Sequence, residues 1–248
     1  MSNSISLSSS KIKLCLATDL DGTFLGGSDL QRKALYNFIE ENREEISLIF
    51  VTGRDIPFVK SLIDSNDVPR PDFIIGDVGT TIVSGHDFKA IAEVQDWVDS
   101  LWEGEDRARE LMKAHPHLKE QDIYGGKRVS FFYDDHLKAV AAAKDVRDAG
   151  FDAIFSANLY FDILPRGVKK GPTLLKLLEV LNISSDKVLT AGDTLNDLSL
   201  FETKLKSVAV SNSEELLVNE LKNFDNVFHA SEEGTAGIQQ AIKHFEFF

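Results

Sequence analysis

The sequence predicts an α/β protein with a Rossmann-like, doubly wound parallel sheet of about six strands and an inserted α+β cap domain. Three observations predict this fold. Short apolar runs alternate with helical patterns in both halves of the chain, the alternation is interrupted between about 84 and 164, and several predicted strands end in polar residues. Ligands of open α/β sheets bind at the carboxyl ends of the strands, so we expect a polar site at that edge.

The first part of the chain alternates between predicted strands and helices. Ser28 and Gln31 have the spacing of a capping box, which predicts the start of a helix. The predicted elements are a strand over 12–17, a helix over 29–43, a strand over 46–51, a helix with Phe58, Val59, Leu62 and Ile63 facing inward, and a strand over 72–76. Right-handed crossovers between these strands give a doubly wound sheet.

Residues 84–164 are expected to form a separate cap domain with a mostly antiparallel sheet. Residues 81–83, which precede this domain, and residues 88–91, at its start, are expected to pair as a hairpin. The other predicted elements are a helix from 94 to about 118, a strand over 128–133, a helix over 136–149, and strands over 151–155 and 160–164. The α/β core domain then comprises 1–83 and 165–248.

The α/β alternation resumes after Gly167. Gly171 and Pro172 open an apolar helical pattern, and proline is tolerated in a first helical turn. Strands are predicted over 188–191, 207–210 and 226–228, with helices between them and over 237–245.

Composition narrows the classes of partner and compartment. The chain has 248 residues and a formal net charge of −13, which argues against nucleic acid or an anionic membrane surface as the main partner. Cys15 is the only cysteine, so no intramolecular disulfide can form, as fits a reducing compartment. No apolar run approaches the length of about 20 residues that spans a bilayer. The Ser-rich segment 1–10 lacks the apolar stretch of a secretory signal, and we expect a cytoplasmic protein with a flexible N-terminal tail.

Two carboxylates lie at the end of the first predicted strand. Asp19 and Asp21 repel one another as anions, and no lysine or arginine adjoins them in the sequence. A divalent cation such as Mg²⁺ or Ca²⁺, which prefers oxygen ligands, would relieve that repulsion. Asp-Gly is also an ordinary turn sequence, so this pair alone does not predict a site.

Three further polar clusters occupy equivalent positions in the fold. They are Thr52 with Gly53 after the second strand, Lys169 with Lys170 before a helix, and Asp193 with Asn196 and Asp197 after a later strand. Carboxylates hold a hard metal ion, while hydroxyl, amide and ammonium groups hold anionic oxygens. Phosphoryl transfer requires this combination of positioning and charge stabilisation.

The order of the four motifs resembles that of the haloacid dehalogenase (HAD) superfamily of phosphatases. These motifs are Asp-x-Asp-Gly-Thr at 19–23, Thr-Gly-Arg at 52–54, Lys-Gly at 170–171 and Gly-Asp-x-x-Asn-Asp at 192–197. The resemblance implies that Asp19 attacks phosphorus and becomes a phosphoaspartate. It implies that Asp21 protonates the leaving group and then activates water. It further implies magnesium bound by Asp19, the backbone carbonyl of Asp21, and Asp193.

The resemblance also assigns the phosphate-binding groups. Thr52, Gly53 and Lys170 would hold phosphate oxygens, and Lys170 is favoured over Lys169 because the family's lysine directly precedes glycine. Asn196 and Asp197 would bind the metal through water or orient Lys170. Arg54 would either contact the substrate or cap the next helix, and the sequence leaves both roles open.

The insert resembles the Cof-type cap, class two of the B subtype. Segment 160–171 resembles the stretch that leads from that cap to the conserved lysine. Segment 127–131 resembles a strand of the sucrose-phosphate phosphatase and mannosylfructose-phosphate phosphatase branch, although Thr194 and Leu195 replace the usual serine and glycine of that branch. A cap excludes water and recognises the leaving group. Candidate substrate-binding residues are Asp77, Gly79, Thr80, Lys127, Asn158 and Asp162.

The expected function is a magnesium-dependent phosphatase for a small sugar phosphate, namely a disaccharide or glycoside phosphate such as sucrose 6-phosphate or mannosylfructose phosphate. One alternative is a phosphomannomutase-like phosphomutase, which would need cap cations for a second phosphate. The cap offers Arg107, Arg109, Lys113, Lys119, Lys127 and Arg128 for that purpose. Another alternative is a generalist Cof-like phosphatase. Asp21 and the insert argue against a signalling receiver domain, and the intact set of chemical groups argues against a non-catalytic sugar-phosphate binder.

Overall fold

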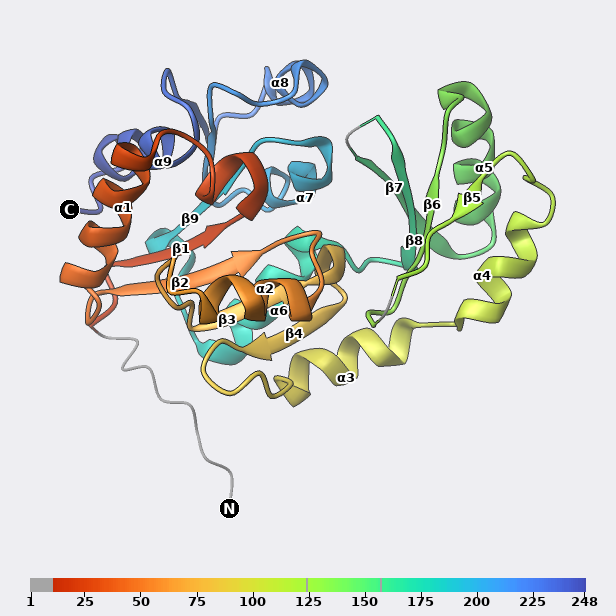
Figure 1. The fold of residues 1–248 in the computed structure, drawn as a ribbon, viewed down its shortest axis with the longest axis horizontal. Helices are drawn as coiled ribbons and strands as arrows, with labels where there is room; N and C mark the ends of the chain where they lie inside the picture. The colour runs from red at the N-terminus through yellow and green to blue at the C-terminus, as the bar shows by residue number, and fades with distance from the viewer. Residues whose placement is uncertain (1–10, 124, 157) are drawn as a thin grey trace.

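Two β-sheets organise the protein (Figure 1). The structure is a computed structural model that describes residues 11–123, 125–156 and 158–248, so the N-terminal tail lies outside the described residues. The larger sheet has seven strands in the order β11-β10-β9-β1-β2-β3-β4, and the smaller has four in the order β5-β6-β8-β7. The strands of the larger sheet are β1 (Leu14–Thr18), β2 (Ile46–Val51), β3 (Phe73–Gly76), β4 (Thr81–Ser84), β9 (Val188–Gly192), β10 (Lys206–Ala209) and β11 (Val227–His229).

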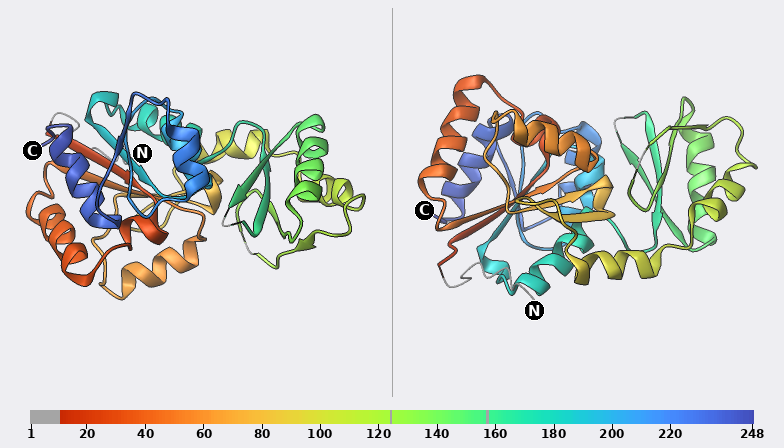
Figure 2. Two further views of the ribbon diagram at one scale, coloured as in Figure 1. Left: turned by 90° about the horizontal axis from the view of Figure 1, so that it is seen from above. Right: turned by 60° about the horizontal axis from the view of Figure 1, so that its bottom comes forward.

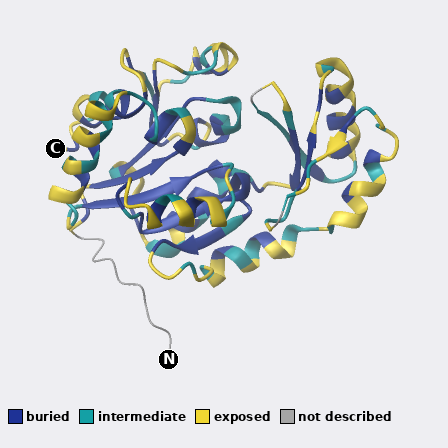
Figure 3. Ribbon diagram, in the orientation of Figure 1, coloured by how far each residue is buried: buried dark blue, intermediate teal, exposed yellow. Residues whose placement is uncertain are grey.

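The larger sheet confirms the doubly wound α/β core. All its neighbouring strands from β11 to β3 pair in parallel, and β4 adds one antiparallel edge strand. Except for the edge strand β11, its strands are buried over nearly their whole length (Figure 3), as strands covered on both faces should be. Helices α1 (Asp29–Glu41), α2 (Ile56–Asp64) and α9 (Gly234–His244) pack on one face, and α3 (Ala92–Leu101), α6 (Lys170–Leu181) and α7 (Leu198–Phe201) on the other. Helix α8 (Glu215–Leu221) packs near α7.

The single helix expected from 94 to 118 is wrong. Two helices, α3 and α4 (Glu105–Met112), are separated by residues 102–104: Trp102 is already extended, and Gly104, with a φ of 101°, precedes the start of α4. Val94 and Val98 of α3 pack into the core cluster, whereas α4 packs against the smaller sheet. The expected hairpin is reduced to a bridge between Val83 and Ala90, and β4 pairs along its other edge with β3. The domain bounds 84–164 stay a prediction.

The smaller sheet is entirely antiparallel, and helices cover one of its faces. It comprises β5 (Lys119–Glu120), β6 (Val129–Phe132), β7 (Phe151–Ser156) and β8 (Tyr160–Pro165), backed by α4 and α5 (His136–Asp148). Side chains alternate along β8: Phe161 and Ile163 pack in the cluster beneath α5, which leaves Tyr160 and Asp162 on the opposite face. Both views of Figure 2 show this sheet lying between α5 and the core. We call residues 105–165 the cap.

The cap lies over the carboxyl edge of the core sheet. The arrows of β1 and β2 in Figure 1 point toward the cap, and β7 contacts the short helical turn η4 (Leu195–Asp197) of the core. None of the described helices has both the length and the apolar character needed to cross a membrane. The fold therefore leaves one enclosed edge of the core sheet, where the predicted motifs end.

Candidate active site

Three adjacent strands deliver the acidic and hydroxyl side chains to this edge. Asp19 follows β1, Thr52 follows β2 and Asp193 follows β9, and these strands are neighbours in the sheet. After Asp19 the chain turns sharply, and Gly22 has a φ of 79°. A Cβ at Gly22 would lie 2.1 Å from Oδ2 of Asp193, so only glycine lets these two loops approach so closely.

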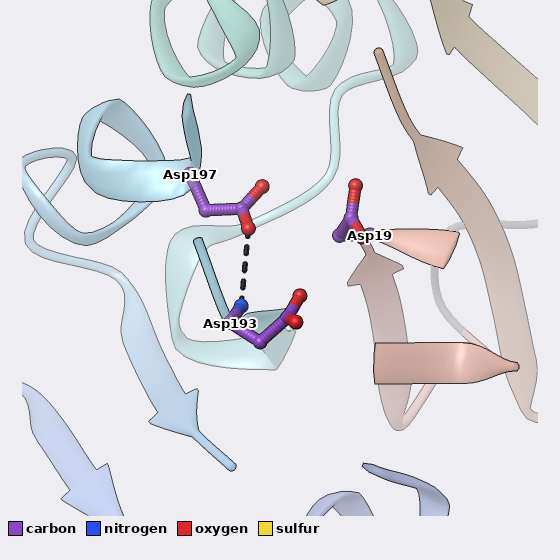
Figure 4. A group of neighbouring side chains, drawn as sticks. All are labelled: Asp19, Asp193 and Asp197. Carbon is purple, nitrogen blue, oxygen red and sulfur yellow. Dashed lines mark hydrogen bonds between the residues drawn. The ribbon is translucent and has the colours of Figure 1, made fainter. Parts of the chain in front are cut away.

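Lys170 connects the motifs from opposite ends of the chain. Its fully buried Nζ lies 2.6 Å from Oδ1 of Asp19, 2.7 Å from Oδ1 of Asn196 and 2.6 Å from Oδ1 of Asp197. Oδ2 of Asp197 accepts hydrogen bonds from the backbone N–H groups of Asp193 and Thr194, both at 3.0 Å. Asp19, after β1, thus lies close to Asp193 and Asp197 of the loop after β9 (Figure 4).

Lys169 points elsewhere. Its Nζ lies 3.5 Å from Oδ2 of Asp152 in the cap, and its side chain is 32% exposed. Of the two adjacent lysines, Lys170 is therefore the one whose ammonium group reaches the carboxylates.

The site carries more negative than positive charge. Burial raises the pKa of Asp19 well above its ordinary range, although the positive charge of Lys170 opposes this shift. Burial, together with the nearby carboxylate of Asp197, raises the pKa of Asp193 to about 7. Burial alone would lower the pKa of Lys170, but Asp19 and Asp197 raise it above its ordinary value. One permanent cation thus faces three carboxyl groups.

The three carboxylates suit a divalent cation. Asp19, Asp193 and Asp197 each offer an oxygen, and these oxygens all lie within 4.8 Å of one another. No other cluster of this kind occurs in the described part of the chain. Hard cations such as Mg²⁺ prefer such oxygen ligands, and a cation bound here would offset the burial and the Asp197 carboxylate that raise the pKa of Asp193. The donor set therefore fits the metal that the sequence motifs imply.

The carboxylate of Asp21 does not join that cluster. It accepts hydrogen bonds from Nε of Arg54 at 2.8 Å and from Nη2 of Arg54 at 3.0 Å. The guanidinium group of Arg54 also lies 4.5 Å from the ring centroid of Phe58. If Asp21 binds the metal, it therefore does so through its backbone carbonyl and not through its carboxylate.

The start of α2 answers one question that the sequence left open, the role of Arg54, and corrects one expectation, the orientation of Phe58. The carboxylate of Asp55 caps α2 by accepting a 2.8 Å hydrogen bond from the backbone N–H of Phe58, so Arg54 is not the cap. An aspartate followed by a proline in the first helical turn, here Asp55 and Pro57, is a sequence pattern that predicts the N-cap of a helix. The expectation that Phe58 faces inward is wrong, because it lies in the first turn of α2 at the sheet edge and is 37% exposed.

A cleft of about 460 Å³ separates the core from the cap. From the core it is lined by Asp19, Asp21, Gly53, Arg54, Asp55, Phe58, Val78, Thr194 and Asn196, and from the cap by Gln121, Arg128, Ser156, Tyr160 and Asp162. Gln121, Ser156 and Tyr160 were not predicted as substrate contacts, and Arg128 was considered only for the second phosphate of a mutase. The alternation along 160–163 could have indicated Tyr160, because it shares a face with Asp162.

The proposed substrate contacts in the core loop are mostly covered. Gly79 lies against the start of α6, where an added Cβ would be 2.6 Å from the carbonyl carbon of Lys169. Thr80 is fully buried, and its Oγ1 donates to the carbonyl of Asp77 at 2.9 Å. Asp77 is buried as well, but its carboxylate pairs with Arg128 of the cleft wall at 3.0 Å.

The other predicted contacts divide between the cleft and the surface. Asp162 lines the cleft, whereas Lys127 and Asn158 are not among its lining residues. Nζ of Lys127 lies 3.8 Å from Asp99, and Asn158 is exposed between β7 and β8. Thr52 is buried beside Gly53, and its Oγ1 accepts the 3.1 Å hydrogen bond of the Arg54 N–H. The functional roles assigned to all these residues stay predictions.

Several known proteins are similar in sequence to this chain over more than nine tenths of its length. This chain is 40% identical over 235 residues to glucosylglycerol-phosphate synthase of Pseudomonas anguilliseptica, covering 94% of this chain but 31% of that protein. It is 30% identical over 241 residues to mannosylfructose-phosphate phosphatase of Agrobacterium fabrum, covering 93% and 96% respectively. It is 31% identical to sucrose-phosphatase 1 of Nicotiana tabacum, of which it spans 60%.

Solved structures share its fold. A sucrose-phosphatase from Synechocystis sp. PCC6803, in complex with sucrose and phosphate, superimposes with a TM-score of 0.88 at 22% identity, covering 95% of this chain and 98% of that one. A haloacid dehalogenase-like hydrolase from Bacillus subtilis gives a TM-score of 0.69 at 19% identity, covering 96% and 93%. The family model for sucrose-6F-phosphate phosphohydrolase matches residues 12–246. The chain therefore belongs to the sucrose-6F-phosphate phosphohydrolase family, the sucrose-phosphatase-like branch of the HAD phosphatases.

Proposed function

We propose that this chain is a magnesium-dependent phosphatase that hydrolyses a small glycoside phosphate through a phosphoaspartate at Asp19. The observation that carries the proposal is the placement of Asp19 in the cleft, bonded to the buried ammonium group of Lys170 and two residues before Asp21. Membership of a phosphatase family supports the same reaction. The free, buried Cys15 supports a reducing, cytoplasmic setting.

In the proposed reaction, an oxygen of Asp19 forms a bond to phosphorus while the bond from phosphorus to the leaving oxygen breaks. Asp21 gives its proton to that oxygen. Water then attacks the phosphoaspartate, Asp21 takes the water proton, and inorganic phosphate leaves. Lys170, with Thr52 and the backbone of Gly53, stabilises the charge on the phosphoryl oxygens. Bound magnesium, held by Asp19, Asp193 and the backbone carbonyl of Asp21, would add positive charge beside the transferred group.

The cap wall favours a neutral, hydroxyl-rich leaving group over a second phosphate. The guanidinium of Arg128 lies between the carboxylates of Asp77 and Asp162, at 3.0 and 3.7 Å, so its charge is already compensated. Three other cap cations considered for a mutase pair with carboxylates outside the cleft lining: Arg107 with Glu103, Arg109 with Glu105 and Glu120, and Lys113 with Glu110. A phosphomutase must bind a second phosphate, which this wall does not favour.

Sequence similarity supports one glycoside phosphate as the first substrate to test. The highest of the identities quoted above, 40%, is to a segment of a glucosylglycerol-phosphate synthase, and the mannosylfructose-phosphate and sucrose phosphatases lie at 30% and 31%. We therefore place glucosylglycerol phosphate first, followed by mannosylfructose phosphate and sucrose 6-phosphate.

The test is phosphate release in the presence of Mg²⁺ across these three glycoside phosphates, simple hexose phosphates and p-nitrophenyl phosphate. Glucose 1-phosphate with its bisphosphate serves as the mutase control. We expect rapid release from one glycoside phosphate, and a loss of at least about 10³-fold in Asp19→Asn with the fold retained. Isomerisation without release would instead make the protein a mutase. Equally slow release from every compound would contradict a glycoside phosphate as substrate.

A further inference from the structure

Arg128 is a largely buried cation with unused hydrogen-bond donors. Its side chain is 10% exposed and lines the cleft. Nη2 donates to Oδ1 of Asp77 at 3.0 Å, whereas Nη1 lies 3.7 Å from Oδ1 of Asp162, which is longer than a hydrogen bond. Nε is buried without a partner, so Asp77 is the one hydrogen-bond acceptor of Arg128 among the described residues. Guanidinium has five N–H donors, and leaving buried donors unfilled is costly.

Arg128 also joins the two parts of the protein. Asp77 belongs to the core loop after β3, and Asp162 belongs to β8 of the cap. The carboxylate of Asp77 is held by the Thr81 hydroxyl, which donates to Oδ2 at 2.7 Å. The chain just before Arg128 is seated on the same loop, because the N–H of Lys127 donates to Oγ1 of Thr80 at 3.1 Å. The contact between Arg128 and Asp77 therefore requires the cap to lie against the core.

Asp162 supplies a complementary acceptor beside this donor. The hydroxyl of Ser130 donates to Oδ1 of Asp162, and no hydrogen bond to Oδ2 is found in the described part of the chain. A sugar hydroxyl both donates and accepts hydrogen bonds, so it can accept from Arg128 and donate to Asp162. Two carboxylates flank the arginine, which disfavours an anionic group at the same place.

We propose that Arg128 and Asp162 together bind a hydroxyl of the glycosyl leaving group, and that Asp77 holds Arg128 in position for this contact only while the cap is closed. Arg128 is then a specificity-determining residue that couples recognition of the leaving group to closure. This inference rests on the proposed function, because it presumes a glycoside phosphate in the cleft.

The test compares two substrates in Arg128→Met. The glycoside phosphate that the wild type hydrolyses best presents hydroxyls, whereas p-nitrophenyl phosphate has a leaving group without any. A charged hydrogen bond is worth about 1.5–3 kcal/mol, so kcat/KM for the glycoside phosphate should fall about 10- to 150-fold. With p-nitrophenyl phosphate it should change less than about threefold. Equal losses with both substrates, or no loss with either, would overturn the proposal.

Three further variants separate recognition from folding. Arg128→Met leaves the carboxylate of Asp77 without its ion-pair partner. The double variant Arg128→Met with Asp77→Asn removes that uncompensated charge. It should lose activity toward the glycoside phosphate and not toward p-nitrophenyl phosphate, as Arg128→Met alone does. Asp77→Asn alone should lower kcat/KM for the glycoside phosphate about tenfold and spare p-nitrophenyl phosphate. Arg109→Met is a control for the loss of a cap arginine, because Arg109 pairs with Glu105 and Glu120 but lies outside the cleft lining and is more exposed than Arg128. It should behave as the wild type with both substrates.

The proposed function and this inference fail in different ways. If the wild type releases phosphate from no glycoside phosphate, the proposed function fails before any variant is made. If it does release phosphate and Arg128→Met has no substrate dependence, only the inference fails.

Discussion

Replacing Lys170 with methionine removes the single ammonium group that three acceptors share. Asp19 is 5% exposed where it lines the cleft and Asp197 is fully buried, so both largely buried carboxylates lose the ammonium group that neutralises them. Removing one member of a buried ion pair costs about 3–5 kcal/mol. We expect the free energy of unfolding of Lys170→Met, measured without magnesium near pH 8, to fall by about that amount.

The loss should depend on pH and on magnesium. Burial raises the pKa of Asp19 in the folded state, so folded Asp19 binds a proton more readily than unfolded Asp19 does. A carboxyl group of this kind contributes stability below its unfolded pKa and loses it as pH rises through the folded pKa. Without Lys170 the folded pKa rises further, so the variant's deficit should shrink toward acidic pH. Magnesium binds only the folded site and should restore part of the deficit near pH 8.

Urea unfolding followed by circular dichroism measures these effects, with Lys169→Met as the matched control. Lys169 is 32% exposed and forms a looser ion pair with Asp152, which should be worth less than about 1 kcal/mol. Initial-rate assays should show kcat reduced by at least about 10³-fold in Lys170→Met and nearly unchanged in Lys169→Met. Equal destabilisation by the two substitutions, or a loss in Lys170→Met that does not vary with pH, would refute the reasoning.

Three other predictions concern the metal, the acid and the loop beneath the cleft. Calorimetric titration of the wild type should show Mg²⁺ affinity rising between about pH 6 and 8, because the pKa of Asp193 is about 7 and its proton must leave on binding. The same dependence in Asp193→Asn would contradict this assignment. Arg54→Met should lower kcat about tenfold, because the Asp21 carboxylate loses the guanidinium group that holds it in position. The free energy of unfolding should change little, because both side chains are half exposed. An unchanged kcat would show that Asp21 does not need Arg54 to hold it in position. In urea unfolding, Gly79→Ala should cost at least about 2 kcal/mol, since its φ is 108° and its Cβ would meet Lys169. Gly167→Ala, also at positive φ but with open space around the Cβ, should cost about 1 kcal/mol, and an equal or larger loss at Gly167 would contradict the packing argument.

Local patterns predicted most of the core. The capping box of Ser28 and Gln31 forms with both of its hydrogen bonds, because both residues lie within a single helical turn. The apolar runs became buried parallel strands, since continuous apolar sequence suits only a sheet that is covered on both faces. Gly104 was harder to interpret, because helical periodicity continues on both sides of the break.

Local sequence patterns do not predict which side chains line the cleft. Lys127 and Arg128 are adjacent cations; Lys127 was predicted as the substrate contact, whereas Arg128 lines the cleft. The choice depends on strand register: Val129 of β6 pairs with Ile163 of β8, and a shift by one residue would reverse which side chains face the core. Phe58 is another such case, because helical spacing cannot tell where α2 extends past the edge of the sheet.

The sequence by itself determined the order of the core strands and helices along the chain, the acidic, hydroxyl and lysine groups of the site, and the place of these groups next to strand ends and at the start of α6. These follow from periodicity and from motifs a few residues long. Only the tertiary structure decided that Lys170 meets Asp19, 151 positions away along the chain, and that Arg128 spans core and cap. The physical reason is that such contacts depend on strand order, on register and on packing between two sheets, and none of these is encoded in any one short segment.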